Sequence, residues 1–170
     1  LCAHRRGRLG VAGLNAAVEE LLSAAVQGFE PSEEHYLGQP ILIRRNDYAV
    51  RRFNGDVGVV VKRAAAAGQP SLQVAFPGTS EEPVEYLAPS RLPEHQTVFA
   101  TTIHKSQGSQ FDHALIMLPS RPSPILTREL IYTGVTRAAR HVTLVGDRRI
   151  LVDALGRTVQ RASGLREQLW

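Results

Sequence analysis

The chain has 170 residues, and its 43% hydrophobic content is enough to form a core and argues against a disordered segment. Twenty Lys and Arg against sixteen Asp and Glu give a net charge of +4, which permits a nucleic-acid-binding face without requiring one. The single cysteine excludes an internal disulfide and a zinc cluster built on cysteines, no apolar run approaches membrane-spanning length, and the start lacks a signal-peptide core, so we expect a reducing, cytoplasmic location.

The first forty residues predict one helix between two irregular segments. Residues 1–10 indicate a short strand followed by a basic turn, in which Arg5 is either a site residue or part of a solvated loop. Apolar residues recur at helical spacing over 13–27, which predicts a helix that covers a sheet. Residues 28–38 contain a proline and mixed charges and are expected to form a linker.

The next sixty residues change to the pattern of short strands. Apolar or alternating segments predict strands at 41–43, 57–61, 72–76 and 84–87. Asn54-Gly55 predicts a tight turn, because this pair readily adopts positive φ, and 64–68 reads as a further turn region. Short strands separated by Gly and Pro turns are typical of a small β-barrel.

The last seventy residues alternate between strand and helix patterns. We expect strands at 98–102, 113–118 and 142–146, and helices near 103–108, 127–139 and 148–157. This alternation is typical of an α/β domain with a mainly parallel sheet.

Residues 101–112, Thr-Thr-Ile-His-Lys-Ser-Gln-Gly-Ser-Gln-Phe-Asp, collect polar groups just before a glycine. Thr101 or Thr102 can cap a short helix, and Gly108 can end it in a left-handed turn. Thr102, His104 and Lys105 at such a helix start suit a phosphate group, which makes them candidates for DNA contact. Alternatively, Thr102 only caps, His104 bonds a buried carbonyl and Lys105 is solvated.

Residues 129–140, Glu-Leu-Ile-Tyr-Thr-Gly-Val-Thr-Arg-Ala-Ala-Arg, predict a helix capped by Thr127 and packed on the sheet. Arg137 near its end can reach across a cleft as a cation. Alternatively it pairs with a carboxylate such as Asp147. Tyr132 and Thr133 can help to position this block, although a tyrosine on a packed helix such as Tyr132 is more often expected in the core.

These two blocks, in this order around a strand, resemble motifs V and VI of superfamily 1 DNA helicases, and most closely the RecD branch, the alpha subunit of exodeoxyribonuclease V. The segments 1–5, 10–15, 40–48, 53–58 and 89–93 resemble the same family. The resemblance implies a RecA-like second motor domain (2A) formed by 1–39 and 98–170, with an inserted SH3-like β-barrel (2B) at 40–97. The start at Leu1 rather than Met favours a fragment of a longer protein.

The resemblance also implies roles for individual residues on the nucleotide side. Arg137 takes the place of the arginine that reaches the γ-phosphate of ATP, which makes it the catalytic candidate. Gly108, Gln110 and Arg5 fall at positions near the nucleotide. Gln110 is a departure, since the family usually has Glu there, and Gln keeps a carbonyl acceptor but loses the charge.

The chain contains no Gly-x-x-x-x-Gly-Lys-Ser/Thr phosphate loop. ATP and Mg²⁺ would therefore be held mainly by a first motor domain, and we expect this fragment to be inactive alone. The full enzyme would be an ATP-dependent 5′–3′ helicase on single-stranded DNA, with RecB- and RecC-like partner subunits, in double-strand break repair and recombination. The alternatives are a stand-alone RecD-like or conjugative relaxase-type helicase, and a non-enzymatic nucleic-acid or protein-binding module.

Overall fold

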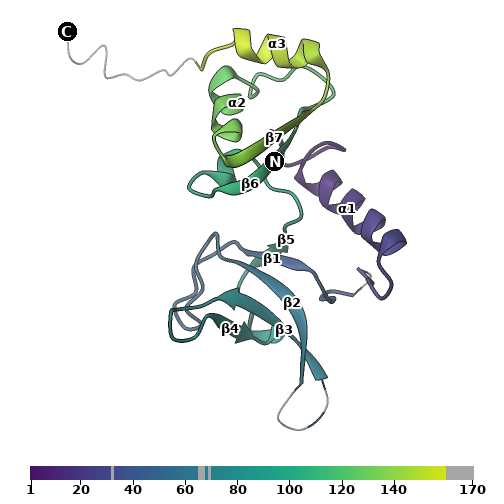
Figure 1. Cartoon of the computed structure of the whole chain (residues 1–170), viewed down its shortest axis with the longest axis vertical. Coiled ribbons are helices and arrows are strands. Elements are labelled where there is room, and N and C mark those ends of the chain that lie inside the picture. Colours follow the sequence, from purple (N-terminus) through teal and green to yellow (C-terminus); the bar gives the residue numbers. More distant parts are fainter. Residues whose placement is uncertain (32, 65–67, 69, 160–170) are drawn as a thin grey trace, which may run out of the picture. The chain divides into compact units, whose positions relative to one another are not determined.

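The computed structural model describes residues 1–159 except 32, 65–67 and 69, and it divides the chain into two compact units (Figure 1). One unit comprises Leu1–Ala12 and Thr101–Trp170, and the other comprises Gly13–Ala100. Most of the turn expected at 64–68 and the end of the chain after residue 159 lie outside the described residues. Each unit is described by itself below.

The unit Gly13–Ala100 holds nearly all of helix α1 (Val11–Ala25) and one antiparallel sheet. The sheet order is β4 (Val84–Leu87), β3 (Pro70–Pro77), β2 (Val57–Ala64), β1 (Pro40–Ile43) and β5 (His95–Thr97), with the short 3₁₀ turn η1 (Pro89–Arg91) before β5 (Figure 1). The four strands predicted between 41 and 87 are confirmed. Closure into a barrel is not confirmed, because β4 and β5 each pair with a single neighbour among the described residues.

The core of this sheet forms from alternating inward side chains, namely Ile41, Ile43, Val60, Val74, Phe76 and Leu87. The predicted turn at Asn54-Gly55 is confirmed, with Gly55 at φ +107°. Gly58 is required for a different reason: a Cβ there would come within 2.8 Å of the Phe76 ring. The phenyl group therefore packs directly on the backbone of β2.

The strand predicted at 98–102 is wrong. The strand is His95–Thr97, which pairs with β1 through the partners Ile41↔Thr97 and Ile43↔His95. Beyond this strand, the side chain of Asn15 in α1 provides hydrogen bonds that a neighbouring strand would otherwise provide. It donates to the Thr97 carbonyl at 3.1 Å and accepts from the Ala100 N–H at 2.8 Å. A side chain that is distant in sequence thus satisfies the backbone where the apolar pattern predicted a strand.

The unit formed by Leu1–Ala12 and the residues from Thr101 onward has α/β architecture. Its elements are the 3₁₀ turn η2 (His104–Ser106), β6 (Phe111–Met117), α2 (Arg128–Val135), β7 (Ala138–Val145) and α3 (Arg148–Gly156). The β6–β7 pair is parallel, and Cys2 forms further parallel bridges to Thr102 and Met117. The described pairings of this unit are all parallel, as predicted.

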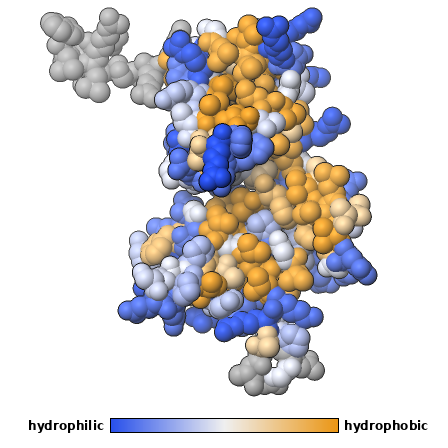
Figure 2. All heavy atoms as spheres, in the orientation of Figure 1, coloured by the Kyte–Doolittle hydropathy of each residue, from blue (hydrophilic) through white to orange (hydrophobic). Residues whose placement is uncertain are grey.

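Helices α2 and α3 share an apolar core with the sheet, formed mainly by Ile103, Ile116, Leu118, Leu126, Leu130, Ile131, Ile150 and Ala154. Gly134 lets α2 approach closely, since a Cβ there would lie 3.0 Å from Ile116 Cδ1. Apolar residues also reach the surface of each unit, as the orange atoms in Figure 2 show. On β6 and β7 the exposed ones are Phe111, Leu115, Val142, Leu144 and Val145.

Helix α2 is shorter than the predicted 127–139. Thr127 caps its start as expected, accepting from the Leu130 N–H at 3.3 Å. The helix ends at Val135 because the chain must turn at Thr136 and Arg137 to enter β7 at Ala138. Arg137 therefore lies in the turn after the helix rather than within it.

Candidate functional site

The segment from Thr102 to Ser106 forms a single 3₁₀ turn rather than the predicted helix over 103–108. Thr102 is 7% exposed, and its hydroxyl accepts from the Lys105 N–H at 3.2 Å, so the predicted capping role is confirmed. Its carbonyl accepts from the Ser106 N–H at 3.1 Å. The Thr102 side chain thus already has an intramolecular partner.

The side chains of this turn alternate between buried and exposed positions. Ile103 and Ser106 are buried, and the Ser106 hydroxyl donates to the Ile103 carbonyl at 2.8 Å. His104 and Lys105 lie between them and are exposed. The packing therefore presents an imidazole and an ammonium group side by side in the sequence on a fixed turn.

Gly108 ends this turn in a left-handed conformation, with φ +87°, as predicted. Nothing lies within 4 Å of a Cβ built on it, so the backbone conformation, not space, favours glycine here. Ser109 and Gln110 follow as exposed residues before β6 begins at Phe111. Together they form a loop at the amino end of β6.

The guanidinium of Arg137 lies against this loop. Its Nη1 donates to the Ser109 carbonyl at 3.2 Å, its Nε to the Thr133 carbonyl at 3.1 Å, and its Nη2 to the Thr136 hydroxyl at 3.2 Å. The Arg137 carbonyl in turn accepts from the Phe111 N–H at 2.8 Å. The fold thus joins the two sequence blocks at the amino ends of two parallel strands.

The acceptors of Arg137 are all neutral. The alternative partner Asp147 instead caps α3, accepting from the Arg149 N–H at 2.7 Å. Among the described residues, no carboxylate forms an ion pair with Arg137. The half-buried guanidinium therefore keeps a positive charge without an anionic partner, in a fork that matches phosphate oxygens.

Two predicted nucleotide-side residues are exposed but not tied to Arg137. Arg5 lies in the basic turn, where its carbonyl accepts from the Ala12 N–H at 3.2 Å. The side chains of Arg5 and Gln110 form no hydrogen bond or ion pair within the part of the chain that the structure describes. Their predicted roles stay predictions.

The structure places Tyr132 of α2, and Thr136 directly after this helix, differently from what the sequence predicted. Tyr132 is 69% exposed, so its expected place in the core is wrong, because the buried stripe of the short helix consists of Leu130, Ile131 and Gly134. The sequence did not predict a site role for Thr136, although its hydroxyl contacts Arg137. The signal that could have identified it is its position directly before that arginine.

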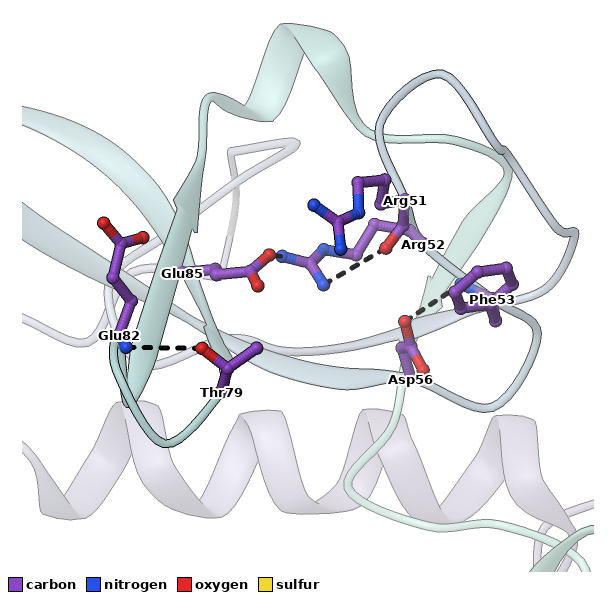
Figure 3. Close-up of polar contacts among 7 residues, drawn as sticks. All are labelled: Arg51, Arg52, Phe53, Asp56, Thr79, Glu82 and Glu85. Carbon is purple, nitrogen blue, oxygen red and sulfur yellow. Dashed lines mark hydrogen bonds and ion pairs between the residues drawn. The ribbon is translucent and has the colours of Figure 1, made fainter.

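A second anchored arginine, Arg52 in the other unit, has different surroundings (Figure 3). It borders a cavity of about 300 Å³ that Asp56, Thr79 and Glu85 also line. Arg52 forms an ion pair with Glu85, donates to the Arg51 carbonyl at 3.3 Å, and stacks on Phe76 with its guanidinium carbon 4.5 Å from the ring centre. Its charge is compensated within the unit.

Metal and membrane features are absent from the described residues. No group of three or more His, Cys, Asp or Glu there is arranged to hold a metal ion. None of the helices in the described part of the chain is long and apolar enough to cross a membrane.

Comparisons with known proteins identify relatives over almost the whole chain. It is 44% identical to the RecBCD enzyme subunit RecD of Mycobacterium tuberculosis (strain CDC 1551 / Oshkosh) over 99% of this chain and 28% of the relative. The Haemophilus influenzae RecBCD subunit RecD is 39% identical over 97% of this chain and 24% of its own length. The ATP-dependent RecD2 DNA helicase of Deinococcus radiodurans is 34% identical over 79% of this chain and 18% of its own length.

The chain thus spans about a quarter of the length of the RecD subunits it matches. Among solved structures, the Pif1 helicase from Bacteroides in complex with ADP-AlF3 and ssDNA aligns with a TM-score of 0.46 and 17% identity, over 91% of this chain and 42% of that one. Residues 97–145 match the UvrD-like helicase C-terminal domain, a range that includes the Thr102 turn, the Gly108 loop and Arg137. Over almost its whole length, the chain is therefore similar to RecD subunits and corresponds to a fragment of them.

Proposed function

We propose that this chain is part of the C-terminal motor region of an ATP-dependent 5′–3′ DNA helicase, a RecD-like subunit of exodeoxyribonuclease V. In this proposal the longer protein, called the parent below, works in the cytoplasm with RecB- and RecC-like subunits in double-strand break repair and recombination. The identity to RecBCD RecD subunits, 44% over 99% of the chain against 34% over 79% for the RecD2 helicase, favours the subunit over a stand-alone helicase.

One observation carries the proposal for chemistry, namely the uncompensated cation of Arg137 beside the Gly108 loop. ATP supplies the phosphoryl group that is transferred to water. Arg137 would release the neutral carbonyl of Ser109 and direct its planar fork to the γ-phosphate oxygens. A fixed cation at that point stabilises negative charge that develops during phosphoryl transfer.

The neighbouring residues would serve the nucleotide and DNA sides of the same unit. Exposed His104 and Lys105 suit contact with a DNA phosphate, and Thr102 holds their turn. Gly108 and Gln110 would lie toward the ribose, where the Gln110 carbonyl can accept a hydrogen bond. Arg5, exposed in its basic turn, is proposed to face the nucleotide.

The described residues suit phosphate oxygens better than a metal ion. Arg137 offers a matching donor set, whereas no cluster of His, Cys, Asp or Glu that could hold Mg²⁺ is present among them. We therefore propose no Mg²⁺ ligand among the described residues. That ion and most contacts to ATP would belong to a first motor domain.

The proposed domain plan follows the family. Residues 1–39 and 98–170 would form the RecA-like motor domain 2A, and residues 40–97 an SH3-like insertion, 2B. Exposed apolar side chains on β6 and β7 support a unit that packs against further protein, since such surfaces commonly mark interfaces.

The test is DNA-stimulated ATP hydrolysis by the full-length parent with any subunits that co-purify. We expect Arg137→Ala to lower turnover by roughly a thousand-fold or more, the range reported for loss of such an arginine, while most single-strand binding remains. Arg140→Ala is the matched control, because the ion pair of this exposed arginine in the described part of the chain is with Asp112, at 3.7 Å.

Near-normal turnover in Arg137→Ala would remove Arg137 from its role. Wild-type parent that binds DNA but hydrolyses no ATP, even with its partner subunits, would instead favour a non-enzymatic binding module. Activity in the isolated 170-residue chain would place the nucleotide chemistry elsewhere than proposed.

A further inference from the structure

The contacts of the Arg137 guanidinium differ in kind. Two of its acceptors, Ser109 and Thr133, are main-chain carbonyls, which no side-chain substitution removes. The third is the hydroxyl of Thr136. Within the described part of the chain, Thr136 is thus the side chain that hydrogen-bonds this guanidinium.

The Thr136 hydroxyl is itself oriented. It donates its proton to the Thr133 carbonyl at 3.0 Å, which leaves its lone pairs for Nη2 of Arg137 at 3.2 Å. The same Thr133 carbonyl accepts from Arg137 Nε at 3.1 Å. Arg137 and Thr136 therefore share one acceptor, and this shared contact restricts the direction in which the fork points.

The helix end does not need this hydroxyl. The Thr136 main-chain N–H bonds the Tyr132 carbonyl at 3.0 Å and also reaches that of Gly134, so the turn after α2 is closed by the backbone. Thr136 has φ −71° and ψ −2°, a conformation that other L-residues adopt without strain. Its hydroxyl can thus be tested apart from the fold of the turn.

We propose that Thr136 is a positioning residue for Arg137, whose hydroxyl holds the guanidinium fork in the orientation from which it engages a phosphate. The inference rests on the proposed function and deepens it. A fork that is held before the reaction loses less side-chain freedom in the transition state, so the benefit appears in the rate of the chemical step. Binding of ATP depends mainly on the other motor domain in this proposal.

The experiment compares Thr136→Val and Thr136→Ser in the full-length parent, with any co-purifying subunits, by DNA-stimulated ATP hydrolysis. Valine keeps the branched shape without the hydroxyl, whereas serine keeps the hydroxyl. We expect Thr136→Val to lower kcat roughly ten-fold, the range for one hydrogen bond to a charged group, with KM for ATP changed less than about two-fold. We expect Thr136→Ser to restore most of the loss.

Thr143→Val is the matched control. It also removes a threonine hydroxyl from this unit, but that hydroxyl contacts His113 Nε2 at 2.7 Å, and Thr143 makes no contact with Arg137. Its kcat should equal wild type. Thermal unfolding of all variants is measured beside activity, and Thr136→Ala replaces the valine variant if valine unfolds early.

Wild-type kcat in Thr136→Val would overturn the inference. So would an equal loss in Thr136→Ser, or a loss that follows the thermal midpoint, since either would indicate a merely structural role. Failure of the proposed function is distinct: the wild-type parent itself would then lack activity, or Arg137→Ala would retain it.

Discussion

Arg52 and Arg137 are both held by several contacts, yet their surroundings suit opposite purposes. Arg52 is 7% exposed, pairs with Glu85 and stacks on Phe76. Arg137 is half-buried, and among the described residues its guanidinium hydrogen-bonds two carbonyls and one hydroxyl. We expect the compensated arginine to stabilise its own unit and the uncompensated one to keep its charge for an outside anion. The presence of a carboxylate partner, rather than burial alone, separates the two.

Among the tests of the difference between Arg137 and Arg52, we expect the largest effect from Arg137→Lys in the full-length parent. Lysine keeps the positive charge but cannot form a planar fork with two phosphate oxygens. We expect ATP turnover to fall roughly a hundred-fold, with the thermal midpoint unchanged. Steady-state ATPase assays measure this, and wild-type turnover in the lysine variant would mean that charge alone suffices.

The corresponding test of Arg52 is Arg52→Met in the 170-residue chain. The change leaves the partly buried Glu85 carboxylate without its cation, so we expect a loss of about 3 kcal/mol in the free energy of unfolding. Urea unfolding followed by circular dichroism measures it. Arg137→Ala in the same chain should change stability by less than about 0.5 kcal/mol, and equal losses in both would end the contrast between the two arginines.

Gly58 leaves room for the ring of Phe76, on which Arg52 stacks. A methyl group at Gly58 would meet the Phe76 ring at 2.8 Å, so Gly58→Ala should destabilise the unit by about 2 kcal/mol through overpacking. Gly156→Ala is the control, because nothing lies within 4 Å of a Cβ at that position. A neutral Gly58→Ala in urea unfolding would show that Phe76 can move away freely.

The smallest expected effect concerns the start of α2, the helix that leads to Arg137. Thr127→Ala removes the hydroxyl that accepts from the Leu130 N–H and should cost about 1 kcal/mol of unfolding free energy. Thr127→Ser should recover most of it. If Thr127→Ala instead lowered ATP turnover of the parent while the folded state stayed populated, the cap would also affect the position of Arg137.

Features that depend on neighbouring residues were predicted correctly. The caps at Thr102 and Thr127, the left-handed Gly108 and the Asn54-Gly55 turn each involve partners a few residues apart, so the sequence carries their signal. The strand predicted at 98–102 was wrong because the pairing with β1 ends at the Val98 N–H, which donates to the Pro40 carbonyl, and the Ala100 N–H donates to the side chain of Asn15, 85 residues away. The helix at 127–139 was too long because the start of β7 is set by its pairing with β6.

The sequence by itself determined the resemblance to RecD-like helicases, the local caps and turns, and the choice of Arg137 as the candidate cation, because motifs and short-range hydrogen bonds depend on adjacent residues. Only the tertiary structure decided which arginine is compensated. Arg52 meets Glu85 33 residues away, and Arg137 meets the Ser109 carbonyl 28 residues away. Such pairings depend on strand register and helix packing, which place distant residues side by side.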